Sequence, residues 1–166
     1  VTQQWSDWLT VTVRLNADEA HLEQEWTVGP VDISDGFGHE VVSKWTTDIA
    51  SNEEFWTDSN GREMQKRKIN YRPTWKLNVT EPIAGNYYPI NAAAFIKDTT
   101  RQFTILTDRS QGGGSIAAGE LEVMVHRRIL FDDHRGVGEP LNETTSCTAY
   151  PHFKRLGTGL VIRGTH

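Results

Sequence analysis

Apolar and polar residues alternate with a period of two along most of the chain, and this alternation predicts β-strands. In residues 8–16, the apolar side chains of one face are Leu9, Val11, Val13 and Leu15. In residues 21–30 a second apolar face is formed by Leu22, Trp26 and Val28, and Gly29-Pro30 ends the run. The two segments predict a hairpin around residues 16–20.

Further strands are predicted at residues 40–47, 72–79, 91–98, 101–110, 120–130 and 159–165. Turns rich in Asp, Asn, Ser and Gly are predicted between strands at residues 58–61, 98–100, 111–115 and 132–136, with a flexible hairpin loop at the glycine-rich stretch. No segment keeps a helical period over three turns. The pattern therefore predicts an all-β protein, an antiparallel sandwich of two sheets, with Trp26, Trp45 and Trp75 in its core.

Composition narrows the class of protein. The 166 residues suit one domain, and 17 Lys and Arg against 22 Asp and Glu give a net charge of −5, which argues against a nucleic-acid partner. The longest apolar run, near residues 92–96, is too short to cross a membrane.

The single Cys147 excludes an internal disulfide and leaves a disulfide partner elsewhere possible. The chain opens without Met, and we expect it to be a piece of a longer polypeptide.

Opposed charges gather at the end of the strand predicted at residues 120–130. Alternation places Arg127 on the apolar face of Leu121 and Val123, and Arg128 on the opposite face. A guanidinium on an apolar face needs an acceptor, and Asp132 and Asp133 follow in the next turn.

If those ion pairs brace the turn, Arg135 and Gly136 lie at its tip, where binding residues are often presented. The alternative, that Arg135 is a solvated turn residue, stays open on spacing alone.

Other chemical motifs are weak. Residues 39–43 begin like a zinc-protease helix, but Ser43 replaces the second ligand, and the histidines at 126, 134 and 152 have no local metal-site spacing. No metal site is therefore predicted within the chain. Asn78 and Asn142 begin N-glycosylation sequons.

Several blocks resemble the lysosomal-type α-mannosidases of glycoside hydrolase family 38. They are residues 21–31, 55–67, 84–92, 103–113 and 120–144, in the family's order, and the resemblance covers the chain from about residue 5 to residue 166. The block that ends in Asp-Asp-His-Arg-Gly is the most specific.

The resemblance implies a large retaining enzyme that hydrolyses terminal α-mannosides of N-glycan-type oligosaccharides in the lysosome, the vacuole or outside the cell. Its zinc and its aspartate nucleophile belong to an α/β domain for which this chain has no counterpart. Residues 1–166 would form part of the C-terminal β-sandwich region, of the galactose-mutarotase type, and would be inactive alone. Their partners would be the other domains and a mannose-containing oligosaccharide.

The family also implies a role for the charged turn, in which Arg135 would reach the mannose pocket. The charge pattern itself predicts the residues that support this loop, namely Asp132, Asp133, Gly136, Arg127 and Arg128. Two alternatives stay open for the isolated segment. It would be a non-catalytic carbohydrate-binding module if exposed tryptophans bind sugar, or a purely structural interdomain sandwich if it binds nothing.

Overall fold

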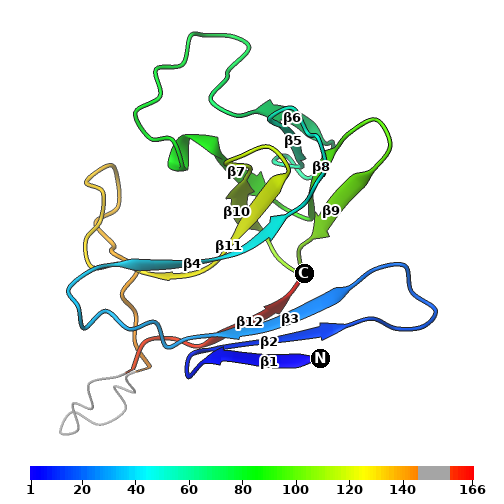
Figure 1. The fold of residues 1–166 in the computed structure, drawn as a ribbon. Coiled ribbons are helices and arrows are strands. Elements are labelled where there is room, and N and C mark those ends of the chain that lie inside the picture. The colour runs from blue at the N-terminus through cyan, green and yellow to red at the C-terminus, as the bar shows by residue number, and fades with distance from the viewer. Residues whose placement is uncertain (146–157) are drawn as a thin grey trace, which may run out of the picture. The chain divides into compact units, whose positions relative to one another are not determined.

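A computed structural model describes residues 1–145 and 158–166, which form antiparallel sheets and one 3-10 turn (Figure 1). Cys147 and His152 lie outside the described residues. The elements are β1 (Thr2–Ser6), β2 (Leu9–Arg14), β3 (Glu23–Val28), β4 (His39–Thr46), β5 (Glu54–Thr57), β6 (Gln65–Lys68), η1 (Ala84–Asn86), β7 (Tyr87–Ile90), β8 (Ala93–Lys97), β9 (Gln102–Leu106), β10 (Gln111–Gly114), β11 (Glu120–Arg128) and β12 (Ile162–Thr165). In this part of the chain no helix has the length and apolar character that a membrane span requires.

The chain divides into two compact units. Unit 1 contains residues 1–41 and 125–165, and unit 2 contains residues 42–124 and 166. The division falls within β4 and β11, which belong to one sheet of order β4-β11-β10-β7. The other two sheets have the orders β1-β2-β3-β12, in unit 1, and β6-β5-β8-β9, in unit 2.

Unit 1 contains the predicted hairpin. Strands β2 and β3 pair antiparallel from Leu9 opposite Val28 to Arg14 opposite Glu23, and β12 pairs with the other edge of β3. Trp26 and Val28 are buried, as their shared face predicts, whereas Leu15 and Leu22 lie beyond the ends of the strands and are exposed. The alternating pattern thus located the hairpin and overestimated the length of its apolar faces.

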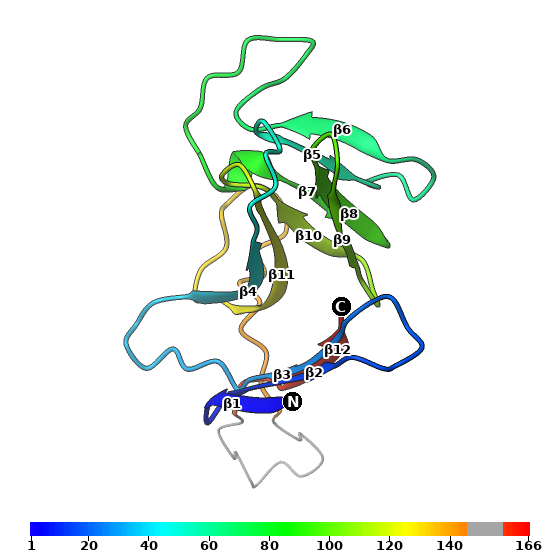
Figure 2. The ribbon, with the colours of Figure 1, turned by 45° about the vertical axis from the view of Figure 1, so that its right-hand side comes forward.

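Unit 2 contains the main hydrophobic core and confirms the predicted sandwich. Figure 2 shows β5, β8 and β9 next to β7 and β10 in this unit. The buried residues of the core come from both sheets and from the connection between β4 and β5, and are Ile49, Phe55, Ile90, Ala94, Ile96, Ile105, Leu121 and Val123. Trp45 and Tyr88 pack against this cluster, and Tyr88 meets the ring of Phe55 edge to face at 5.8 Å between centroids. Apolar burial from two facing sheets therefore stabilises this unit.

The glycine-rich segment is a strand and not the predicted hairpin loop. Gln111–Gly114 forms β10, which pairs with β7 and β11. A Cβ on Gly114 would lie 2.0 Å from the Asn86 carbonyl oxygen, and one on Gly113 would lie 2.6 Å from Ile90 Cδ1. The glycines are present because neighbouring backbone and side chains approach this strand too closely for any side chain.

The strand predicted at residues 72–79 is not formed. These residues lie in an irregular loop. Asn86 closes the base of this loop: its Oδ1 accepts the N–H of Asn70 at 2.8 Å, and its Nδ2 donates to the Pro82 carbonyl at 2.7 Å. Arg72 donates to the carbonyls of Tyr71 and Gly85. Trp75 is 59% exposed, so its predicted core position is wrong. Local hydrogen bonds at the base, rather than a sheet ladder, define this loop.

Candidate functional site

The turn after β11 is held by its own aspartates. We call residues 132–136 the acidic turn. Asp132 Oδ1 accepts the backbone N–H of His134 at 2.6 Å, and Asp133 Oδ1 accepts that of Arg135 at 3.0 Å. His134 has a φ of 56°, a left-handed conformation that such local side-chain bonds stabilise. The carboxylates therefore shape the backbone directly.

The two strand arginines occupy different environments from those predicted. Arg127 is exposed, and Arg128 is partly buried. The expectation that Arg127 lies on the apolar face is wrong, because the core that covers Leu121 and Val123 belongs to unit 2 and ends before this residue. Among the described residues no ion pair joins either arginine to Asp132 or Asp133.

Arg128 instead binds uncharged acceptors in unit 1. Its Nε donates to Asn142 Oδ1 at 2.6 Å, and its Nη1 donates to the Val31 carbonyl at 3.1 Å. A Cβ on Gly159 would lie 2.8 Å from the same Nη1, so the chain passes close over the guanidinium. Arg128 thus connects the end of its strand to Val31, 97 residues before it, and to Asn142, 14 residues after it. These contacts were not visible in the sequence pattern.

Arg135 projects from the acidic turn with an exposed side chain. Its backbone N–H is bound by Asp133, and no described residue accepts a hydrogen bond from its guanidinium. Gly136 follows with a φ of +155° and has open space where a Cβ would be. Two local hydrogen bonds thus shape the turn, and the guanidinium of Arg135 is exposed.

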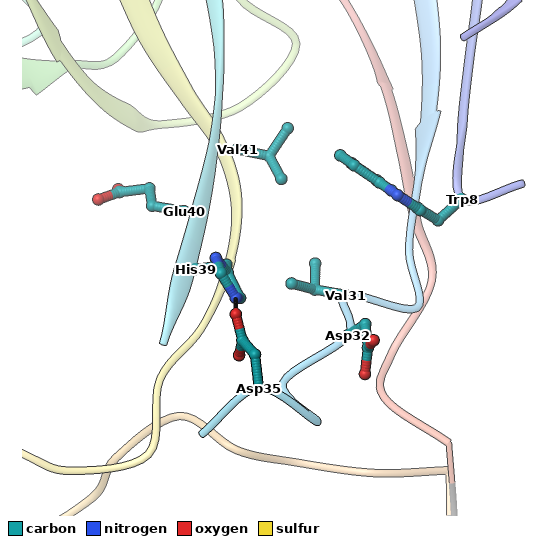
Figure 3. A pocket seen from close by; sticks show the side chains of 7 residues that line it. All are labelled: Trp8, Val31, Asp32, Asp35, His39, Glu40 and Val41. Carbon is teal, nitrogen blue, oxygen red and sulfur yellow. Dashed lines mark hydrogen bonds and ion pairs between the residues drawn. The ribbon is translucent and has the colours of Figure 1, made fainter. Parts of the chain in front are cut away.

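A pocket of about 310 Å³ lies within unit 1 (Figure 3). It is lined by Trp8, Val31, Asp32, Asp35, His39, Glu40 and Val41. Figure 3 shows the side chains of Trp8 and Val41 directed toward each other, while Glu40 points away from them. Residues 39–41 begin β4, a strand, so the residues that resemble the start of a zinc-protease helix do not form one.

Both aspartates of the pocket are held by hydrogen bonds. Asp35 Oδ1 accepts the backbone N–H of Phe37 at 3.0 Å, and Asp35 Oδ2 lies 2.9 Å from His39 Nε2. The N–H of Phe37 is the main cause of the lowered pKa of Asp35, with His39 contributing.

Asp32 accepts the N–H and hydroxyl of Ser34 at 2.9 and 2.8 Å, and the backbone bond is the main cause of its lowered pKa. Both carboxylates are thereby stabilised in the ionised form.

Sequence reasoning did not single out this pocket. The sequence pattern predicts no role for Trp8, Asp32 or Asp35. The available signal was the Asp-x-Ser and Asp-Gly-Phe pattern of residues 32–37, which favours aspartates that bind nearby backbone. Nothing local indicated that Trp8 lines the same pocket as these aspartates.

The described residues were also tested for a metal site. They contain no group of three or more His, Cys, Asp or Glu side chains placed to hold an ion. The donor set needed for a tetrahedral zinc site is therefore not provided by these residues.

Comparison with known proteins identifies the family. Residues 1–135 match the family described as "Glycosyl hydrolases family 38 C-terminal domain", and the chain belongs to this family. It is 54% identical to the bovine (Bos taurus) "Lysosomal alpha-mannosidase" over all 166 residues, which are 15% of that protein. It is 52% identical to the "Lysosomal alpha-mannosidase" of Dictyostelium discoideum over 143 residues, 85% of this chain and 14% of that protein.

The jack bean (Canavalia ensiformis) protein named "Alpha-mannosidase" is 46% identical over the whole chain, which spans 16% of its length. The chain thus spans about 15% of the length of the curated relatives that it matches. The resemblance inferred from the sequence blocks is confirmed.

Proposed function

We propose that this chain is part of the C-terminal β-sandwich region of a retaining α-mannosidase that hydrolyses terminal α-mannosides of N-glycan-type oligosaccharides. The observation that carries the proposal is the 54% identity to a lysosomal α-mannosidase over the full 166 residues. The names of several relatives also favour the lysosome as the site of action.

In this proposal the acidic turn contributes Arg135 to the mannose pocket. A retaining glycosidase forms a covalent glycosyl-enzyme on a carboxylate and then hydrolyses it. That carboxylate and the zinc belong to other parts of the enzyme. Arg135 donates hydrogen bonds to sugar hydroxyls and orients the ring, because its guanidinium is exposed and its backbone is fixed by Asp133.

The supporting roles are distributed unequally. Asp132 and Asp133 fix the backbone of the acidic turn, and Gly136 provides open space next to Arg135. Arg128 holds the strand end through Asn142 and Val31. Arg127, although next in sequence to Arg128, is exposed and is the natural control for any effect of removing an arginine.

Exposed apolar side chains favour contact with other parts of the same enzyme. In the loop of residues 71–83 they are Tyr71, Trp75, Val79 and Ile83, and beside the acidic turn they are Phe131 and Val137, which are 80% and 75% exposed. Surfaces of this kind commonly pack against another domain. This observation also supports the structural role of the segment within a larger protein.

Two sequons complete the proposal. Asn78 and Asn142 are exposed and are proposed as glycan acceptors. At Asn142 the oxygen Oδ1 binds Arg128, whereas a glycan attaches through Nδ2. The hydrogen bond and the modification are therefore compatible.

The activity is tested on the intact protein that contains this chain. We expect hydrolysis of 4-nitrophenyl α-D-mannopyranoside and none of the β-anomer, with retention of configuration seen by NMR. The 166-residue chain alone should be inactive. A folded intact protein that cleaves no α-mannoside would overturn the proposal.

The role of Arg135 is tested by Arg135→Ala in the intact protein. Loss of a charge-assisted donor should lower kcat/KM about 10- to 100-fold. Arg127→Ala should leave kcat/KM within about twofold. Equal kinetics for both variants, with wild-type thermal unfolding, would remove Arg135 from the pocket. Unfolding of Arg135→Ala alone would show a purely structural role.

A further inference from the structure

We propose that the unit 1 pocket binds one pyranose ring of a glycan through Trp8 and the carboxylates of Asp32 and Asp35, which all line it. The proposal goes beyond the function above and takes from it only the choice of a mannoside as the probe. Every lining residue belongs to unit 1 of this chain.

The size of the pocket limits the ligand. Its volume of about 310 Å³ is at the small end of ligand-binding pockets. One sugar ring suits this space, whereas an extended oligosaccharide would have to continue outside it. The site is therefore expected to recognise a terminal residue.

One part of the pocket is apolar. Trp8, Val31 and Val41 line it, and Trp8 is 38% exposed, so its ring is accessible to a ligand. Aromatic rings offer a large, rigid apolar surface with few rotatable bonds. The C–H groups on one face of a pyranose fit such a surface.

The other part of the pocket offers fixed acceptors. Each oxygen of Asp32 and Asp35 already receives one hydrogen bond from Ser34, Phe37 or His39. A carboxylate oxygen has a second lone pair, so these hydrogen bonds do not use up its capacity as an acceptor. The lowered pKa values of both groups keep them ionised in mildly acidic solution. Sugar hydroxyls are the donors that this arrangement suits.

A cationic ligand fits less well. An ammonium or guanidinium group would match the two negative charges, but it would lose hydration against Trp8, Val31 and Val41. Asp35 also has a partner in His39, at 2.9 Å. A neutral sugar uses both the apolar and the accepting groups without the cost of desolvating a ligand cation.

The test uses ¹⁹F NMR of the complete 166-residue chain labelled with 5-fluorotryptophan. The chain has six tryptophans, and the Trp8 signal is assigned as the one lost in Trp8→Phe. Titration with methyl α-D-mannopyranoside should shift the Trp8 signal saturably, with a Kd on the order of 1 mM. Trp5, which is exposed and does not line the pocket, is the internal control.

Matched substitutions test the carboxylates. Asp32→Asn and Asp35→Asn should each weaken the titration about tenfold, since a hydrogen bond to a charged acceptor is lost or reduced. Asp18→Asn, at an exposed position outside the pocket, should leave the Kd unchanged.

Three outcomes overturn the proposal. The first is that the Trp8 signal does not shift at about 100 mM sugar, a concentration that saturates a millimolar site. The second is that the Trp5 and Trp8 signals shift equally. The third is that the Trp8 signal shifts with methylammonium chloride but not with sugar. The last would identify a cation pocket. Because this chain alone is used, failure here leaves the α-mannosidase assay of the intact protein unaffected.

Discussion

The core of unit 2 and the acidic turn of unit 1 are stabilised by different interactions. In unit 2, side chains from two sheets, such as Phe55 and Leu121, bury each other over long sequence separations. In the acidic turn, Asp132 and Asp133 each bind a backbone N–H two residues ahead. The first arrangement resists unfolding, whereas the second fixes local geometry and leaves Arg135 exposed. The buried core and the exposed Arg135 therefore lie in different parts of this chain.

Among the substitutions that test this comparison, Phe55→Ala is expected to change the free energy of unfolding the most. The side chain is 0% exposed and in contact with Tyr88, so its removal leaves a cavity in the core. We expect a loss of about 3–5 kcal/mol in the free energy of unfolding, measured with urea. Phe131→Ala, at an exposed site beside the acidic turn, should change it by less than about 0.5 kcal/mol. Similar losses at the two sites would show that the turn is part of a packed core.

A second test adds one methyl group to the closely packed strand β10. Gly114→Ala places a Cβ against the Asn86 carbonyl and should cost about 3 kcal/mol, since the backbone has to move. Gly85→Ala is the matched control, because no atom lies within 4 Å of its added Cβ. Wild-type stability of Gly114→Ala would contradict the close approach of η1 and β10.

A third test uses pH and His166 in unit 2. Burial lowers the pKa of His166 from its ordinary 6.5 to about 4, with Nε2 3.1 Å from Gln111 Oε1 and the ring edge-on to Trp45. Between pH 6.5 and 4 the unfolded chain therefore binds the proton more readily, and stability falls as the pH is lowered through this range.

We expect His166 to account for a loss of about 2 kcal/mol between pH 7 and pH 4, reduced from the full value because the ring is only partly buried. His166→Gln should flatten the pH dependence of urea unfolding, whereas His21→Gln, at an exposed site, should not. An unchanged slope in His166→Gln would show that this imidazole does not titrate differently in the folded chain.

The smallest effect is expected in the acidic turn itself. Asp133→Ala removes the acceptor of the Arg135 N–H and should cost about 1 kcal/mol or less in unfolding free energy, because the bond is exposed. Hydrogen exchange at the Arg135 amide should nevertheless accelerate about tenfold. A large loss of global stability together with unchanged exchange would reverse the contrast between the two regions.

The sequence predicted strands where alternation and burial coincide. The apolar faces of β2 and β11 include Val11, Leu121 and Val123, and both strands form close to their predicted positions. The same rule failed for residues 72–79, where Trp75, Leu77 and Val79 alternate although hydrogen bonds from Asn86 and Arg72 close a loop. It also failed for β10, because the close packing of this strand requires glycines, and glycines give no alternation of apolar and polar side chains.

The candidate sites were predictable to different extents. The acidic turn was located from Asp132, Asp133 and Arg135, which are adjacent in sequence. The partner of Arg128 was not, because Asn142 and Val31 reach it only through the fold. The pocket combines Trp8 with Asp32 and Asp35 from a separate loop, so no local pattern contains it.

The sheet of unit 1 has a consequence for synthesis on the ribosome. Strand β3 pairs with β2 on one side and on the other with β12, which begins at Ile162, whereas all but one residue of unit 2 lies between Val42 and Met124. A nascent chain that emerges from its N-terminus can thus complete most of unit 2 while one edge of β3 still lacks its neighbour. Until β12 leaves the exit tunnel, that edge of β3 keeps unpaired backbone groups with which another chain could pair.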